Sequence, residues 1–152
     1  MKINIFQIAK NDRDEFEPIV NNFIKMSSKY AKIEIYNLFN NNISKQQSIG
    51  EKEAQKSYSE VFETKLSSGY NIALDVLGKK IDSFGFSHLL NDKVTINFFI
   101  GGAYGFERQF LNKCDAVITL SDLTMAHKIV NLVLLEQIFR GLCISNNHPY
   151  HK

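Results

Sequence analysis

Apolar and polar positions along the chain follow two periods, and together these predict strands that alternate with helices. Period-two alternation or unbroken apolar runs predict strands over residues 2–9, 33–36, 71–77, 94–100 and 116–120. Helical spacing predicts long helices over 12–26, 51–66 and 126–142, with short ones over 83–90 and 107–112. This order predicts one α/β domain over 1–152, with a mostly parallel sheet flanked by helices.

Local chemistry suggests where several elements begin and end. Asn11 or Asp12 is expected to cap the first helix. Residues 37–50, rich in Asn, Ser and Gln, are expected to form a loop. Ser48 and Glu51 have capping-box spacing, so a helix is expected to begin near them. Small residues are expected to end the next two elements: Ser67, Ser68 and Gly69 the helix, and Gly78 the strand.

The predicted helix over 126–142 has apolar residues on all sides, not on one stripe. Such a helix must be buried on more than one side. Its second side is covered either by a large core of the same chain or by another subunit. A dimer is favoured, because an exposed apolar patch of that size is unusual on a monomer.

Composition narrows the class of protein without giving its function. Apolar residues make up 44% of the chain, enough for a folded core, and no apolar run is long enough to cross a bilayer. Cys114 and Cys143 form no CxxC pair, so free thiols in a reducing compartment are expected. A start resembling a strand more than a signal peptide likewise favours the cytoplasm. The net charge of +2 permits a nucleic-acid partner but does not indicate one.

Three segments that follow predicted strands are candidates for a ligand pocket. They are Leu74–Gly78, Gly101–Gly105 and Leu120–Met125. Ligands of open α/β sheets bind at the carboxyl ends of the strands, and glycines let backbone approach a ligand closely. Each segment also has an ordinary interpretation: a tight turn at the glycines, and a helix cap at Ser121 or Thr124.

The polar segment after the last helix holds side chains that commonly bind RNA. Tyr150, His151 and Lys152 lie there, and Arg140 precedes them on the helix. His148 and His151 have HxxH spacing, but a zinc site would need further ligands. No metal is therefore expected.

Four segments, taken in order, resemble one family. They are Phe99-Ile100-Gly101-Gly102-Ala103-Tyr104-Gly105, Leu120-Ser121-Asp122-Leu123-Thr124-Met125-Ala126-His127, Leu134-Leu135-Glu136-Gln137-Ile138-Phe139-Arg140 and Pro149-Tyr150-His151-Lys152. Each segment alone is weakly specific. Together, colinear along the whole chain, they resemble the RlmH family of the SPOUT class of methyltransferases.

The resemblance implies a fold with a C-terminal trefoil knot, a homodimer with the long helix at its interface, and S-adenosyl-L-methionine as cofactor. It implies methylation at N3 of a pseudouridine in 23S rRNA (position 1915 in the family's naming) within the assembled ribosome or large subunit. The residues it places at the cofactor are Leu74, Gly101, Leu120, Ser121, Asp122, Leu123, Thr124 and Met125.

The resemblance also suggests roles in catalysis and RNA binding. Arg140, Tyr150 and His151 are the candidate catalytic residues, with His151 as a possible base and Tyr150 stacking on the target base. The candidate RNA-binding residues are Arg108, His127 and Lys152. The polar segment after the last helix is also a candidate to act in the pocket of the other subunit of the dimer.

The chain departs from the family pattern at two positions. Asn131 stands where the family usually has an arginine, with Lys128 a candidate to compensate, and Ala126 stands where it usually has a proline. Two other functions remain open. One is a related SPOUT methyltransferase acting on tRNA, and the other is a non-catalytic RNA-binding module with the same fold.

Overall fold

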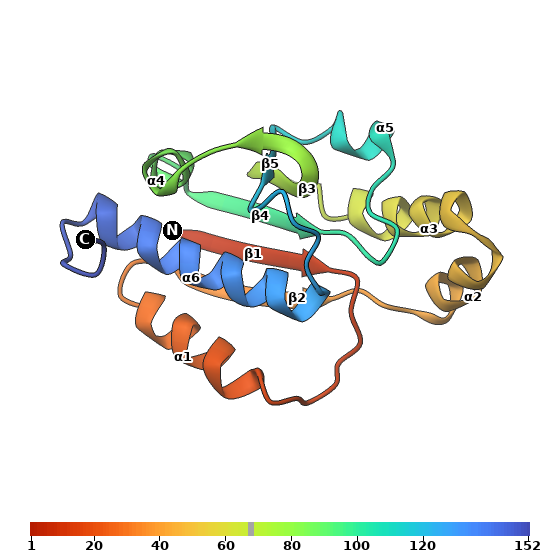
Figure 1. The fold of residues 1–152 in the computed structure, drawn as a ribbon, viewed down its shortest axis with the longest axis horizontal. Helices are drawn as coiled ribbons and strands as arrows, with labels where there is room; N and C mark the ends of the chain where they lie inside the picture. Colours follow the sequence, from red (N-terminus) through yellow and green to blue (C-terminus); the bar gives the residue numbers. More distant parts are fainter. Residues whose placement is uncertain (67–68) are drawn as a thin grey trace.

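The computed structural model describes residues 1–66 and 69–152 and contains a five-stranded sheet between two layers of helices (Figure 1). Every strand pairs in parallel with its neighbours, in the order β2-β1-β4-β3-β5. The strands are β1 (Lys2–Gln7), β2 (Lys32–Asn37), β3 (Tyr70–Lys80), β4 (Thr95–Ile100) and β5 (Ala116–Thr119). The helices are α1 (Glu17–Ser27), α2 (Asn41–Ile49), α3 (Glu51–Glu63), α4 (Ser83–Leu90), α5 (Arg108–Leu111) and α6 (His127–Ser145). The predicted α/β class is confirmed.

Each face of the sheet has its own core, because successive strand residues point to opposite faces. Ile3 and Ile5 of β1 point to the face covered by α1, α4 and α6. Phe6, between Ile5 and Gln7, points to the face covered by α2, α3 and α5. Both faces are therefore apolar, as expected of parallel strands buried on two sides.

Packing within the chain accounts for most of the apolar residues around α6. The helix lies against the sheet between α1 and α4 (Figure 1), and Leu134, Leu135 and Ile138 are fully buried. Phe139 packs on Phe23 of α1. The chain's own core thus covers several sides of α6, whereas Ile129 is exposed and Leu132 and Val133 are half-buried, so the dimer stays a prediction.

Residues 37–50 do not form the predicted loop, because 41–49 are the helix α2. The Asn40 side chain caps this helix by accepting a hydrogen bond from the Ile43 amide at 2.8 Å. Ile43 is fully buried in the core under α2 and α3. A weak amphipathic pattern became a helix because tertiary packing buries that one side chain.

Three predicted helix caps are wrong. Ser48 does not cap α3, because its hydroxyl donates to Lys45 O and the N-cap residue is Gly50. Neither Ser121 nor Thr124 caps α6, where Ala126 is the N-cap residue. The first helix begins at Glu17, not at Asn11 or Asp12, and Asp14 accepts hydrogen bonds from the amides of Phe16 and Glu17.

Strand β3 continues to Lys80, beyond the predicted end at Gly78. Its pairing with β5 shifts, so that Leu74 and Lys79 both lie opposite Ile118. The backbone at Gly78 lies so close to β5 that an added Cβ would be 2.4 Å from the carbonyl carbon of Ile118. Only glycine fits at this position. The trefoil knot itself remains a prediction.

The end of the predicted helix over 51–66, which was expected at Ser67 and Ser68, lies outside the described residues. Within 1–66 and 69–152, no helix is long and apolar enough to span a membrane.

Candidate active site

A cavity of about 530 Å³ opens at the carboxyl edge of the sheet. The three predicted strand-end segments meet there, because β3, β4 and β5 are parallel neighbours whose carboxyl ends share one edge. The lining includes seven of the eight predicted cofactor residues: Leu74, Gly101, Leu120, Ser121, Leu123, Thr124 and Met125. The prediction that these segments form one pocket is confirmed.

The segment after β4 is folded tightly around its glycines. The Gly105 amide donates to Gly102 O at 3.0 Å, and Gly105 has φ of +71°, which favours glycine. Phe106, which follows, is buried against Phe62 and Phe110. This wall of the cavity is therefore largely backbone, held at one end by an aromatic core.

Asp122 is the predicted cofactor residue that does not line the cavity. Its carboxylate forms an exposed ion pair with Lys80 Nζ at 2.7 Å, which connects this loop to the end of β3. Its neighbour Ser121 lines the cavity, and the Ser121 hydroxyl accepts a hydrogen bond from the Leu123 amide at 3.0 Å. Asp122 thus shapes the loop from outside.

His127 begins α6 and lines the same cavity. Burial, and then the nearby Lys128 ammonium, lower the pKa of the His127 imidazole. A neutral ring gives no charge to hold a phosphate, so the predicted RNA-binding role has little electrostatic support. Within the described residues, His127 Nδ1 and the Oδ1 of buried Asn131 have no hydrogen-bond partner. Lys128, the candidate to compensate for the arginine missing at 131, forms an ion pair with Asp14 at 2.6 Å.

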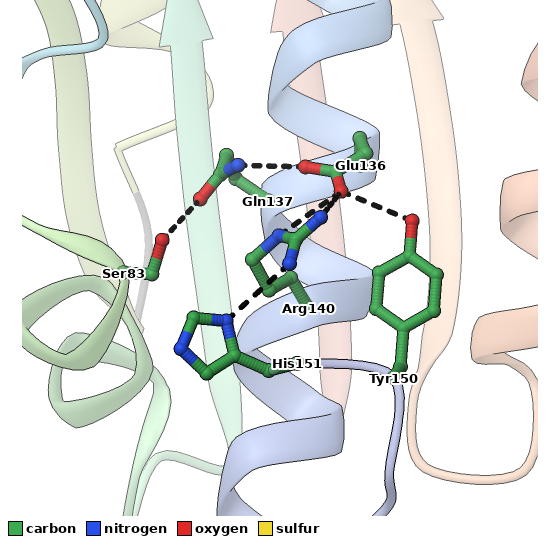
Figure 2. Close-up of polar contacts among 6 residues, drawn as sticks. All are labelled: Ser83, Glu136, Gln137, Arg140, Tyr150 and His151. Atoms are coloured by element: carbon green, nitrogen blue, oxygen red, sulfur yellow. Dashed lines mark hydrogen bonds and ion pairs between the residues drawn. The ribbon is translucent and has the colours of Figure 1, made fainter.

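The predicted catalytic residues Arg140, Tyr150 and His151 meet at a second place, around Glu136 (Figure 2). Glu136 Oε1 accepts hydrogen bonds from Arg140 Nε at 3.0 Å, from Arg140 Nη2 and from the Tyr150 hydroxyl at 3.0 Å. Its other oxygen accepts from Gln137 Nε2 at 2.6 Å. The segment 146–152, hereafter the tail, folds back along α6 and brings these groups together.

The same contacts fix the chemical states of the cluster. The Glu136 carboxylate raises the pKa of Arg140, so that cation is permanent. Burial and the hydrogen bond to Glu136 raise the pKa of the Tyr150 hydroxyl, so it remains protonated. Arg140 Nη1 lies 3.3 Å from His151 Nδ1. A guanidinium only donates, so His151 Nδ1 is the acceptor in this contact. The proposed base therefore has its lone pair engaged.

The cavity and the Glu136 cluster lie at opposite ends of α6. His127 and Arg140 are 13 positions apart, which at 1.5 Å per residue is roughly 20 Å along the helix. One chain therefore does not bring its own predicted catalytic residues to its own cavity. Arg108, at the start of α5, and Lys152, in the tail, are exposed and lie apart from each other in the sequence and the fold.

Sequence reasoning missed several residues of these sites. Glu136 was visible as an acidic residue four positions before Arg140, a spacing at which helical side chains meet. Glu51 and Gln55 of α3 line the cavity, and no local signal places them there. No three His, Cys, Asp or Glu side chains in the described part of the chain are close enough together to hold a metal ion.

Comparison with known proteins gives concordant matches. A family model described as predicted SPOUT methyltransferase matches residues 1–151. The chain is 65% identical to ribosomal RNA large subunit methyltransferase H of Aliarcobacter butzleri and 51% identical to that of a Sulfurovum species, with all of each chain covered. A crystal structure of a candidate RNA methyltransferase from Bacillus anthracis aligns with a TM-score of 0.51 at 13% identity, covering 99% of this chain and 97% of the other. That structural likeness concerns the fold alone.

Proposed function

The chain belongs to the SPOUT methyltransferase family, and from this we propose that it methylates ribosomal RNA of the large subunit, with S-adenosyl-L-methionine as methyl donor and N3 of a pseudouridine as acceptor. The observation that carries the proposal is the cavity built by three strand-end segments of a parallel sheet. Relatives at 65% and 51% identity over the whole chain, both with the same rRNA methyltransferase name, favour this substrate over tRNA.

The cavity fits the proposed cofactor in size and chemistry. Its volume of about 530 Å³ is within the range of small-molecule sites. Leu74, Ile100 and Leu120 offer apolar surface, and the backbone at Gly101 and Gly102 offers polar groups at close approach. S-Adenosyl-L-methionine supplies a methyl group on a positively charged sulfur, so the protein mainly has to position the acceptor.

The Glu136 cluster has groups suited to the pseudouridine. Methylation at N3 requires loss of the N3 proton, and a fixed cation favours the anion that results. Arg140 is that cation, oriented by Glu136, and Tyr150 offers an aromatic face at the same place. Arg140 occupies His151 Nδ1, so this nitrogen would first have to leave Arg140 before it could accept a proton.

A homodimer would bring the two halves of the site together. Since the cavity and the cluster are about 20 Å apart along α6, a base that reaches both must find one of them on another copy. The surface at the cavity also favours coverage by a partner, because Leu77 is 92% exposed and Leu123 75% exposed. We propose a two-fold dimer in which each tail acts at the partner's cavity, in the cytoplasm where ribosomes are.

The test is transfer of labelled methyl groups to ribosomes, separated large subunits and tRNA from a strain lacking this protein, with the product nucleotide mapped by mass spectrometry. We expect label on a single pseudouridine of large-subunit RNA. Label on tRNA would support the related tRNA enzyme instead. Cofactor binding without any transfer would support the non-catalytic RNA-binding module.

A further inference from the structure

Helix α3 supports the glycine-containing wall of the cavity from behind. Tyr58 of α3 is fully buried, and its ring lies directly against Gly102. A Cβ added at Gly102 would lie 2.5 Å from Tyr58 Cζ and 2.6 Å from its hydroxyl oxygen. The ring therefore fills the space on the side of Gly102 that a side chain would need, and limits how far the loop can retreat from the cavity.

The Tyr58 ring is itself held in place by α2. Gln47 Nε2 donates to the Tyr58 hydroxyl oxygen at 2.6 Å. The buried Phe62, one turn further along α3, belongs to the same core and packs on Phe99, next to the end of β4. Tyr58 is thus fixed at both ends, by a hydrogen bond at its tip and by the core around its ring.

Gln55 holds the same loop from the cavity side. It lies three positions before Tyr58, so both side chains project from neighbouring turns of one face of α3. Gln55 lines the cavity, and its Nε2 donates to Tyr104 O at 2.8 Å across 49 positions of sequence. Helix α3 therefore contacts the loop at Gly102 and again at Tyr104.

We propose that Gln55 and Tyr58 are positioning residues for cofactor binding: they hold the backbone of residues 101–104 in the conformation that receives S-adenosyl-L-methionine. The inference rests on the proposed function and adds α2 and α3 to the site. A loop already ordered before binding loses less conformational entropy when the ligand arrives, so removal of these contacts weakens cofactor binding.

The first test compares Gln55→Ala, Gln55→Glu and Lys56→Ala by calorimetric titration with S-adenosyl-L-methionine. Gln55 is half-buried on α3 and alanine favours helices, so the fold is expected to persist. The glutamate keeps the size of the side chain but cannot donate to Tyr104 O. We expect the dissociation constant to rise about five- to tenfold in both Gln55 variants, because each variant loses one hydrogen bond. Lys56→Ala, an exposed neighbour, should match the wild-type protein.

A second readout separates positioning from general stability. In methyl transfer, the Gln55 variants should raise KM for the cofactor by a similar factor while kcat at saturating cofactor stays within twofold. Tyr58→Phe, which keeps the ring but loses the bond to Gln47, should show the same split with a smaller change. Gln55 variants that bind the cofactor as tightly as the wild-type protein would overturn the inference alone. A wild-type protein that binds no cofactor would overturn the proposed function with it.

Discussion

The carboxylate of Glu136 accepts hydrogen bonds from Arg140, Tyr150 and Gln137, and Arg140 in turn contacts His151. A carboxylate shared in this way fixes the guanidinium plane and the position of the tail at once. A cation–π contact also holds the tail, since the Arg140 guanidinium carbon lies 4.8 Å from the centre of the Tyr150 ring. Exposed tail residues are thereby held in one arrangement.

Removal of either tail side chain should stop methylation without affecting cofactor binding. Tyr150→Ala and His151→Ala are each expected to lower the rate of rRNA methylation by at least about a hundredfold, the usual size of a lost positioning or proton-transfer group. The cofactor dissociation constant should stay unchanged, because neither side chain is among the residues that line the cavity. Normal methylation by both variants would contradict the assignment.

His127 should make stability depend on pH near neutrality. Burial lowers the pKa of this imidazole below its ordinary 6.5, so in the window between the two values the unfolded chain binds more protons than the folded one. The free energy of unfolding should therefore fall as pH falls through 6.5 and below.

The measurement is urea denaturation of the wild-type protein and His127→Gln between about pH 7.5 and about pH 5. The wild-type protein should lose stability relative to the variant on acidification, because only it must keep this ring neutral. The other three histidines are present in both proteins, so their contributions cancel in the difference. A stability difference that is constant with pH would show that His127 is not destabilised as a cation.

At the scale of elements, the sequence predicted most strands and helices because burial on one or two faces leaves a periodic pattern. The bounds of α4 agree with the prediction to the residue, whereas α2 was missed. Nothing local distinguishes residues 41–49 from a polar loop, since Ile43 is the helix's one buried residue. Asn40 is a recognisable helix cap, but α2 also needs the burial of Ile43, and that burial depends on packing with α3.

Three strands are also connected by buried amides. Asn4, Asn97 and Asn71 lie opposite one another on β1, β4 and β3. Asn4 Nδ2 donates to Asn97 Oδ1 at 2.8 Å, and Asn97 Nδ2 donates to Asn71 Oδ1 at 3.0 Å. A shift of one residue would place these amides among apolar side chains, so the ladder favours this register.

Asn97→Ala should destabilise the sheet strongly. The substitution leaves Asn4 Nδ2 and Asn71 Oδ1 without these partners in a buried place, so the free energy of unfolding should fall by about 2–4 kcal/mol. Urea denaturation would measure it, with Asn22→Ala on the exposed side of α1 as control. The control should change stability by less than about 0.5 kcal/mol. Equal effects of the two substitutions would show that the ladder contributes little.

At the scale of the whole molecule, the separation of cavity and cluster is the main functional constraint. Apolar residues on all sides of α6 suggested a dimer, and although α1, α4 and the sheet bury most of them, Ile129 stays exposed and Leu132 and Val133 are only half-buried. The proposed dimer depends mainly on geometry, because two distant groups must act on one base.

Mixed dimers would test this directly. Arg140→Ala should inactivate the tail cluster and leave the cavity intact, whereas Gly102→Val should block the cavity by collision with Tyr58 and leave the tail intact. Each variant alone should be inactive. After unfolding and refolding together, half of the dimers are mixed and each has one complete site, so about a quarter of wild-type activity should return. No recovery on mixing would mean that cavity and tail act within one chain.

The sequence alone predicted the order of the strands and of every helix but α2, the two-faced burial of the sheet and the three strand-end segments, because periodicity and chain direction are local properties. It also placed Arg140, Tyr150 and His151 among the candidates by residue type. The three-dimensional contacts were needed to show that Asp122 lies outside the cavity lining, that Glu136 organises the tail and that α3 supports Gly102. Those facts depend on contacts between residues far apart in the chain, whose partners are set by packing and leave no periodic trace.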